Sequence, residues 1–374
     1  MGSFHVVPGE AIKNGTCTDV YFQRVEEILK EEGINPRVTM EVAAAALPSP
    51  WGVFCGLDDV LTLLEGLAVD VAAMPEGSIF SPGEPVLRIT GRYADFGRLE
   101  TALLGFLCHA SGIATAAARI RTIAGDVPVY SFGSRRQHPA LAAMIERAAW
   151  IGGVDGVSNT CAPDGIPLAG TMPHAFVMCY PSPSDAWESF MRRAPPDVSR
   201  VMLCDTVCDE KQEALRAAAL GCDAVRLDTP RSRRGSMRSI IEEVRWELDA
   251  RGYEHVKIFL SGGITHEDVA AYKDIVDAFG VGGAIANAPV IDFSLDIVEI
   301  EGKITAKRGK KSGVKQVYRL PGGGRALLPV GREAPPGAVP LLVEVIRQGG
   351  VLVREDCHAA RKRLAGALSG MSAD

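Results

Sequence analysis

The stretch that decides the fold is Ala-Val-Arg226-Leu-Asp228-Thr-Pro-Arg-Ser-Arg-Arg-Gly, residues 224–235. Its aliphatic start ends abruptly in charged residues, which is typical of a buried parallel strand whose carboxyl end opens into a site. Such a strand supplies Arg226 and Asp228 from its end, and the following loop supplies three more arginines: Arg231, Arg233 and Arg234. One guanidinium group can donate two parallel hydrogen bonds to the oxygens of a phosphate, so the stretch indicates a phosphate site. A solvated arginine-rich loop is the alternative interpretation.

Two further apolar runs end in glycines, and a helical pattern lies between them at 267–272. The residues concerned are Ser261, Gly262 and Gly263 after the run 256–260, and Gly280 and Gly282 after the run 275–279. Glycines let backbone N–H groups come close to an anion. In a parallel β/α barrel, the loops after the last two strands form the usual phosphate site. With the arginines upstream, the two turns predict a phosphorylated sugar as substrate.

The composition limits the function classes. The chain has 374 residues, 47% of them hydrophobic, which suffices for two or three domains with their own cores. The net charge of −6 argues against a nucleic-acid binder, which presents a strongly basic surface. The start of the chain lacks the pattern of a signal peptide. The uncharged stretch 101–118 is short for a bilayer span and predicts a buried core helix, so we expect no membrane association.

The nine cysteines form no CxxC pair, and most of them lie in apolar runs. This usage fits reduced, core-filling thiols in a cytoplasmic protein. No cluster of ligands with the spacing of a tetrahedral zinc site is visible.

From about residue 125, short apolar runs alternate with helical patterns. The runs predict strands at 127–132, 176–180, 201–204, 224–227, 257–260 and 275–279. The patterns between them predict helices at 139–150, 185–193, 210–219 and 237–250. This alternation implies a parallel sheet, here closed into a barrel.

The two ends of the chain are mixed in character. They predict helices at 19–32, 57–67 and 354–368, strands at 38–45 and 86–90, and a hairpin at 297–304 around Glu301-Gly302. Lysines and arginines crowd positions 303–319, which we interpret first as a solvated surface and second as a nucleotide-contacting loop.

Polar residues follow several predicted strands, and parallel strands bring such residues to one face of a barrel. Phe132 leads into Arg135, Arg136 and His138; Thr171 and His174 precede the run 176–180; and Asp205 ends the run 201–204. Each has a structural alternative: a core position for Phe132, a backbone-bonded histidine for His174, and a helix N-cap for Asp205.

The chain resembles the nicotinate phosphoribosyltransferases of archaea and some bacteria over most of its length. The motifs that carry the resemblance are 18–22 (Thr-Asp-Val-Tyr-Phe), 132–136, 170–174, Asp205-Thr206, 225–230, 261–263 and 279–282. The resemblance implies an α/β fold, with an irregular β/α barrel at 116–285 joined to an α+β sandwich built from both chain ends. The sandwich would comprise residues 1–115 and the C-terminal segment 286–374. It also implies a head-to-tail homodimer whose sites are completed by the neighbouring subunit.

The implied reaction joins nicotinate to phosphoribosyl pyrophosphate (PRPP), giving nicotinate mononucleotide and pyrophosphate in NAD salvage, coupled to ATP hydrolysis. By this resemblance His174 is phosphorylated, Arg226 and Asp228 hold the ribosyl phosphate and ribose, and Asp205 helps to bind Mg²⁺. Phe132 and the partner subunit's Tyr21 enclose the pyridine ring. Family members contact the base or the phosphates at the positions of Arg135, Arg136, His138 and Thr171. The glycine turns and Ser261 would bind the 5-phosphate.

The sequence departs from the family pattern in two places. Ala175 replaces the serine that often follows the histidine, which weakens the prediction of base preference. The C-terminal segment has no cysteine before Cys357, so we expect no structural zinc. Quinolinate and nicotinamide phosphoribosyltransferases remain close alternatives, and a phosphosugar aldolase or isomerase barrel is the alternative of a different class. A non-catalytic sensor is also left open.

Overall fold

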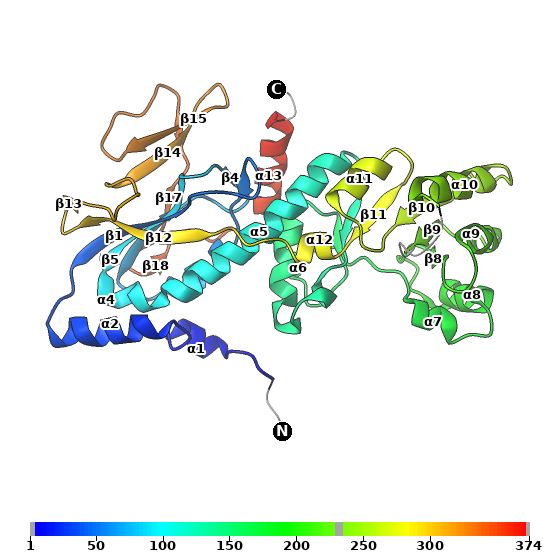
Figure 1. Cartoon of the computed structure of the whole chain (residues 1–374), viewed down its shortest axis with the longest axis horizontal. Helices are drawn as coiled ribbons and strands as arrows, with labels where there is room; N and C mark the ends of the chain where they lie inside the picture. The colour runs from blue at the N-terminus through cyan, green and yellow to red at the C-terminus, as the bar shows by residue number, and fades with distance from the viewer. Residues whose placement is uncertain (1–3, 229–234, 372–374) are drawn as a thin grey trace. The chain divides into compact units, whose positions relative to one another are not determined.

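The computed structural model describes residues 4–228 and 235–371. The predicted arginine cluster at Arg231, Arg233 and Arg234 lies outside these residues. The chain divides into two compact units, residues 1–115 with 289–374 (unit 1) and residues 116–288 (unit 2). Figure 1 shows both units, which we describe separately.

Unit 1 is a mixed helix and sheet structure formed by both ends of the chain. Its helices are α1 (Gly9–Lys13), α2 (Val20–Glu31), α3 (Leu57–Leu64), α4 (Tyr93–Phe96), η1 (Gly97–Leu99), the first part of α5 (Glu100–Ala124) and α13 (Cys357–Met371). Its strands are β1 (Arg37–Ala44), β2 (Gly52–Val53), β3 (Val69–Ala73), β4 (Ile79–Phe80), β5 (Pro85–Arg92), β12 (Phe293–Ile300), β13 (Lys303–Ile304), β14 (Lys315–Arg319), β15 (Arg325–Pro329), β16 (Val339–Pro340), β17 (Val343–Arg347) and β18 (Gly350–Val351).

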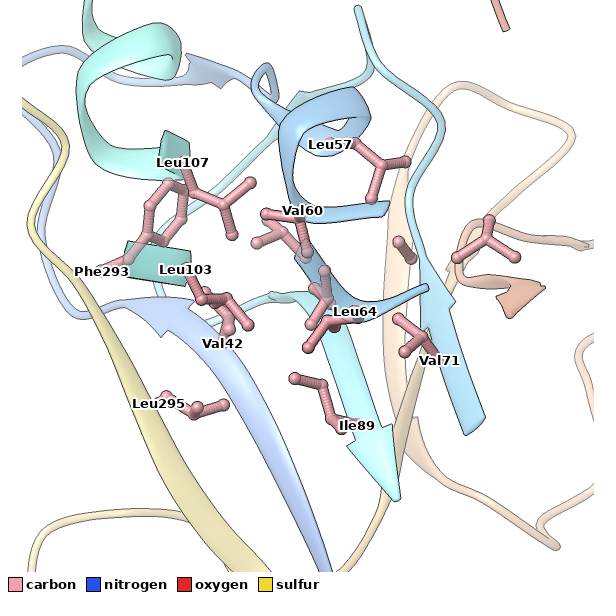
Figure 2. Packing of buried hydrophobic residues seen from close by; sticks show 14 of the residues in the cluster. Val42, Leu57, Val60, Leu64, Val71, Ile89, Leu103, Leu107, Phe293 and Leu295 are labelled. Carbon is pink, nitrogen blue, oxygen red and sulfur yellow. The ribbon is translucent and has the colours of Figure 1, made fainter. Parts of the chain in front are cut away.

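The main sheet of unit 1 is antiparallel, with the strand order β13-β12-β1-β5-β3-β17-β18. β1 pairs with β12 over seven residue pairs, so the two distant chain segments share one sheet. The buried faces of β1, β3 and β5 pack with α3 and the start of α5. Figure 2 shows Leu57, Val60 and Leu64 of α3 and Leu103 and Leu107 of α5 facing the strand side chains of this core. Burial of this apolar surface is the main stabilisation of the predicted α+β sandwich.

Helix α2 forms close to its predicted bounds, with Asp19 at the N-cap position. Its apolar stripe does not reach a core: Tyr21, Val25 and Ile28 are all exposed, and none of the residues in α2 is buried.

The basic segment 303–319 was expected first as a solvated surface, and this is wrong for Lys315, which is buried; Lys307 is exposed but pairs with a buried group. Lys307 and Lys310 both pair with the buried carboxylate of Asp296, at 2.5 and 2.9 Å. Lys315 is 8% exposed and lies 2.8 Å from Oε2 of Glu41, which is 4% exposed. A buried carboxylate is costly unless it is paired or hydrogen-bonded, so these lysines tie the C-terminal segment to β1 and β12.

Unit 2 contains a six-stranded, all-parallel sheet with the order β7-β6-β11-β10-β9-β8. Its strands are β6 (Val129–Ser131), β7 (Gly156–Val157), β8 (Val201–Leu203), β9 (Ala224–Leu227), β10 (Lys257–Leu260) and β11 (Ala278–Val281). Its helices are the end of α5, η2 (Ser134–Arg136), η3 (Pro139–Leu141), α6 (Ala142–Ile151), α7 (His174–Met178), α8 (Pro183–Arg193), α9 (Glu210–Ala219), α10 (Met237–Asp249), α11 (His266–Tyr272) and α12 (Gly283–Ala286). The sheet curls into a half-barrel, which confirms the predicted irregular β/α barrel architecture, but the expected closure is wrong, because β7 and β8 do not pair with each other.

Two predicted strands of unit 2 need correction, and one strand was missed. Residues 176–178 belong to α7, Cys179 is its C-cap, and Tyr180 follows; the rings of Phe176 and Tyr180 meet edge-on with centroids 5.2 Å apart. A short apolar run fits a helix or a strand equally well, and this aromatic pair suits the helix. The short strand β7 was missed because Gly156–Val157 is too brief to show a pattern. β11 starts at Ala278, so Gly280 lies inside the strand and not in the turn after it.

The stretch Tyr93–Ala124 is long and apolar enough to pass for a membrane span by length and composition. Most of its apolar part is buried inside the protein, as predicted for a core helix.

Replacing Lys315 by Met should lower the free energy of unfolding by about 3–5 kcal/mol, because it leaves the buried carboxylate of Glu41 without its cation. Lys311→Met, at an exposed position of the same segment, is the control and should change stability by less than about 0.5 kcal/mol. Urea unfolding of the three proteins checks this. Equal losses in the two variants would contradict the inferred role of the pair.

Burial raises the pKa of Glu100 at the start of α5 to about 7; Asp296 and Asp19 add to the rise, and Lys307 opposes it. The folded state therefore binds this proton more tightly than the unfolded state, where the pKa is near 4.5. Stability from this group is fully present below pH 4.5 and is lost as the pH rises through about 7.

Glu100→Gln should accordingly flatten the fall in unfolding free energy between pH 5 and pH 8. Denaturant unfolding at both pH values, with Glu27→Gln on exposed α2 as the control, measures this difference. If both variants keep the wild-type pH dependence, Glu100 is not the titrating group.

Candidate functional site

Arg226 is the centre of a polar network at the carboxyl ends of β9 and β10. Its Nε donates to Ser261 Oγ at 2.9 Å, and its Nη1 donates to Thr171 Oγ1 at 2.8 Å. Its Nη2 lies 3.4 Å from Oδ2 of Asp228. Ser261 Oγ donates in turn to Asp228 Oδ1 at 2.8 Å. The structure thus brings together four of the predicted site residues and fixes the guanidinium plane on three sides.

His174 lies beside two carboxylates. Its Nε2 is 3.5 Å from Asp228 Oδ2 and 3.8 Å from Asp205 Oδ1, and its Nδ1 is 3.1 Å from Thr206 Oγ1. Its side chain is 40% exposed, so the ring remains reachable from solvent while three polar groups surround it. The predicted alternative of a histidine bonded to backbone does not match these contacts.

Asp205 is almost completely buried, with a side chain 3% exposed. Its Oδ2 accepts the backbone N–H of Asp228 at 2.9 Å, whereas its Oδ1 has no hydrogen-bond partner in the described part of the chain. Burial raises the pKa of Asp205 to about 6; Asp228 also raises it, and His174 acts against the rise. The alternative role as helix cap is wrong, because Asp209 caps α9 through Gln212 N–H.

The aromatic ring of Phe132 lies next to this network. The Arg226 guanidinium carbon is 5.6 Å from the ring centroid, and the ring of Phe259 lies 5.7 Å away in an edge-on arrangement. A Cβ atom added at Gly280 would lie 2.7 Å from Cδ2 of Phe132. Gly280 is therefore required to make room for the ring, which is a steric reason that the sequence pattern did not indicate.

The glycine turn after β10 packs closely against the backbone of Asp228. Gly262 has φ +96°, and a Cβ there would lie 2.7 Å from the carbonyl oxygen of Asp228. Gly263 has φ +75° with open space beside it, and Gly282 is the N-cap of α12. The turn thus brings two strand ends within contact of each other.

The other predicted site residues are not bonded to the Arg226 network. Arg135 and Arg136 are exposed on η2, and the exposed His138 accepts the N–H of Ala140 as the cap of η3. Tyr21 belongs to unit 1, where its hydroxyl donates to Asp19 at 3.4 Å. Their predicted roles toward a substrate stay predictions.

Sequence reasoning missed several residues that shape the site. Glu213 of α9 accepts the backbone N–H groups of the turn after Asp205, and Thr206 contacts His174. Asn159 donates to Ser134 Oγ at 3.0 Å, and Ser134 is the first residue of η2, which carries Arg135 and Arg136. A buried glutamate shortly after a strand-end aspartate was the available signal for Glu213, but burial of a charge cannot be read from one sequence.

A cavity of about 1270 Å³ lies toward the opposite ends of the strands. Its lining includes the first residue of β8, β9, β10 and β11: Val201, Ala224, Lys257 and Ala278. Thr171, the partner of Arg226, also lines it. The polar network itself lies at the carboxyl ends, where ligand sites of parallel α/β barrels are found.

Among residues 4–228 and 235–371, no group of three or more His, Cys, Asp or Glu side chains is arranged to hold a metal ion alone. The unpartnered Asp205 Oδ1 beside Asp228 nevertheless suits Mg²⁺, which often takes one or two carboxylates and completes its shell with substrate phosphates.

The family models of quinolinate phosphoribosyl transferase match the chain in order, the N-terminal domain over residues 19–111 and the C-terminal domain over residues 113–296. The curated nicotinate phosphoribosyltransferase pncB1 of Mycobacterium tuberculosis is 29% identical over 96% of this chain and 92% of its own length.

Among solved structures, nicotinate-nucleotide pyrophosphorylase from Pyrococcus furiosus is 49% identical, covers 100% of this chain and 99% of its own, and superposes with a TM-score of 0.97. Human nicotinic acid phosphoribosyltransferase shares the fold at 21% identity, with a TM-score of 0.76 over 94% of this chain and 93% of its own. Because both domain models match in order and cover more than half of the chain, the protein belongs to the type II phosphoribosyltransferases, the family of quinolinate and nicotinate phosphoribosyltransferases.

Proposed function

We propose that the protein transfers the phosphoribosyl group of PRPP to nicotinate, forming nicotinate mononucleotide and pyrophosphate in NAD salvage. The observation that carries the proposal is the Arg226 network, in which Asp228, Ser261 and Thr171 hold one guanidinium beside His174 and Asp205. A fixed cation and two carboxylates suit a substrate that presents ribose hydroxyls and several phosphates.

In this reaction the pyridine nitrogen forms a bond to the anomeric carbon of the ribose while the bond from that carbon to the pyrophosphate oxygen breaks. The transition state resembles an oxocarbenium ion, as in other glycosyl transfers. No protein nucleophile is needed. The residues act by holding the two reactants in line and by stabilising the departing diphosphate. Arg226 and Asp228 would bind the phosphoribosyl group. The turns at Gly262, Gly263 and Gly282 would lie close to its 5-phosphate.

The pyridine ring would stack on Phe132, whose position is supported by Phe259 and by the absence of a side chain at Gly280. Arg135, Arg136 and His138 follow Phe132 in an exposed loop and would meet the carboxylate or the pyrophosphate. In a head-to-tail homodimer, the partner subunit's Tyr21 would cover the other face of the ring. The exposure of the apolar stripe of α2 is compatible with such a partner.

ATP coupling would pass through His174. The ring nitrogen that carries the lone pair would form the bond to the γ-phosphorus while the bond from that phosphorus to the bridging oxygen breaks and ADP leaves; the proton on the other ring nitrogen would then pass to an adjacent carboxylate. Asp205 would help to hold Mg²⁺ together with substrate phosphates, where the ion would offset phosphate charge. A phosphorylated histidine adds negative charge beside Asp228 and Asp205, which would reorganise the binding of phosphates.

Quinolinate is the second candidate for the pyridine substrate. The matched family models carry the name of quinolinate phosphoribosyl transferase, and a structure at 49% identity is a nicotinate-nucleotide pyrophosphorylase. Quinolinate has a second carboxylate that leaves as CO₂, so it needs additional cations in the base pocket, whereas His174 and ATP have no part in that reaction.

The discriminating experiment supplies PRPP and Mg²⁺ with labelled nicotinate, nicotinamide or quinolinate, with and without ATP. We expect nicotinate mononucleotide from nicotinate, with ATP raising both affinity and turnover. His174→Ala should keep basal transfer but lose the ATP effect, and His5→Ala, an exposed histidine of unit 1, should behave as wild type. Release of CO₂ from quinolinate with no product from nicotinate would overturn the proposal. Retained ATP stimulation in His174→Ala would exclude that histidine as the coupler.

Gly280→Ala should raise the KM for the pyridine substrate about fivefold with a smaller change in the KM for PRPP. The added methyl would displace the Phe132 ring, and an aromatic stacking contact is worth about 1 kcal/mol. Gly170→Ala adds the same methyl into open space and is the control. Steady-state kinetics with each substrate varied in turn test this. An unchanged pyridine KM in Gly280→Ala would argue against stacking on Phe132.

A further inference from the structure

The turn that follows Asp205 is held by a single buried carboxylate. Glu213, in the first turn of α9, is 0% exposed. Its Oε2 accepts the N–H of Thr206 at 2.9 Å, and its Oε1 accepts the N–H groups of Val207 and Cys208, each at 2.9 Å. Three successive N–H groups pointing into a concave turn form a site for an anion, and here the protein's own carboxylate occupies it.

This arrangement has a direct consequence for Thr206. Asp205 on one side is tied to the N–H of Asp228, and Asp209 on the other side caps α9. Glu213 holds the backbone between these two residues through its three hydrogen bonds, so the position from which the Thr206 side chain extends is fixed. Its hydroxyl lies 3.1 Å from Nδ1 of His174.

The contact specifies how the imidazole ring is oriented. Nε2 of His174 faces the carboxylates of Asp228 and Asp205, which accept hydrogen bonds and favour a proton on this nitrogen. In that tautomer Nδ1 carries the lone pair, and the Thr206 hydroxyl donates to it. Without the hydroxyl, a ring that is 40% exposed would lose the hydrogen bond that Nδ1 makes among residues 4–228 and 235–371, and could rotate more freely.

We propose that Glu213 is a positioning residue that acts through Thr206: it holds the 206–208 turn so that the Thr206 hydroxyl fixes the orientation and tautomer of His174. Thr206 contacts the His174 ring, and Glu213 contacts the backbone of Thr206. A neutral amide at position 213 would turn an NH₂ group toward backbone N–H donors, so the substitution Glu213→Gln should loosen the turn without creating a cavity. The kinetic part of this inference rests on the proposed function, whereas the orientation of the ring does not.

The test combines histidine ¹⁵N NMR with kinetics on the full-length protein. The His174 resonances are assigned by their loss in His174→Ala. At one fixed neutral pH, we expect a single dominant tautomer in wild type and in Thr206→Ser, which keeps the hydroxyl. We expect a mixed tautomer signal in Thr206→Val and in Glu213→Gln. The double variant Glu213→Gln/Thr206→Val should be no worse than Thr206→Val alone, because both changes act through one contact.

In the kinetic assay, Thr206→Val should lower ATP-stimulated turnover about tenfold while the KM for nicotinate changes little. At metal sites, removing the partner that orients a histidine lowers metal affinity or activity by about 10- to 100-fold. Thr206→Ser should restore most of the turnover. If no variant, including wild type, transfers phosphoribose, the proposed function fails, but the NMR comparison still decides the role of Glu213.

Glu210→Gln is the matched control. Glu210 is a buried glutamate of the same helix and makes none of the three bonds to the turn. It should leave the His174 signals unchanged. An unchanged tautomer in Thr206→Val would overturn the proposal, as would a His174 signal that responds equally to Glu210→Gln and Glu213→Gln. If Glu213→Gln does not fold, Thr206→Val and Thr206→Ser still decide whether the hydroxyl sets the ring.

Discussion

One guanidinium group organises the carboxyl ends of the parallel sheet. Arg226 emerges from β9 and is bonded to Ser261 after β10 and to Thr171 from the segment before α7. Its third contact, Asp228, is shared with Ser261 and with His174. A planar cation with five fixed donors can satisfy all three neighbours at once, which a lysine cannot do. Ser261, Thr171 and Asp228 are held together by this one guanidinium plane.

Buried carboxylates perform the same task in both units: they hold segments that are distant in sequence. In unit 2, Asp205 receives the N–H of Asp228 and Glu213 receives a whole turn. In unit 1, Glu41 binds both the backbone and the side chain of Lys315, 274 positions away. A buried charge is tolerated only when it is paired and hydrogen-bonded, so these contacts restrict the chain strongly. In unit 2, these bonds fix the backbone from which Asp228 and Thr206 extend.

The glycines of unit 2 show how one sequence signal can have two physical causes. Their positions after β10 and in β11 suggested an approach to phosphate, and Gly263 keeps open space beside its backbone. Gly262 and Gly280 have a different requirement, because a side chain there would collide with Asp228 and with Phe132. The absence of a Cβ thus permits close contact within the protein as well as with a ligand. A pattern of glycines alone does not separate these causes.

Local patterns in the sequence were enough for the strands at 224–227 and 257–260, for helix 210–219 and for the class of fold, because periodicity and strand-end charges depend on neighbours along the chain. They failed at 176–180, where the aromatic pairing of a helix decided the outcome, and at Gly280, which the pairing of β11 placed inside a strand. The amino-acid order determined that Arg226, Asp228, His174 and Asp205 are present at strand ends or beside them. Only the tertiary structure decided that Thr206 and Glu213 support His174 and that Lys315 is buried against Glu41, because these contacts join residues whose burial and direction depend on the packing of separate elements.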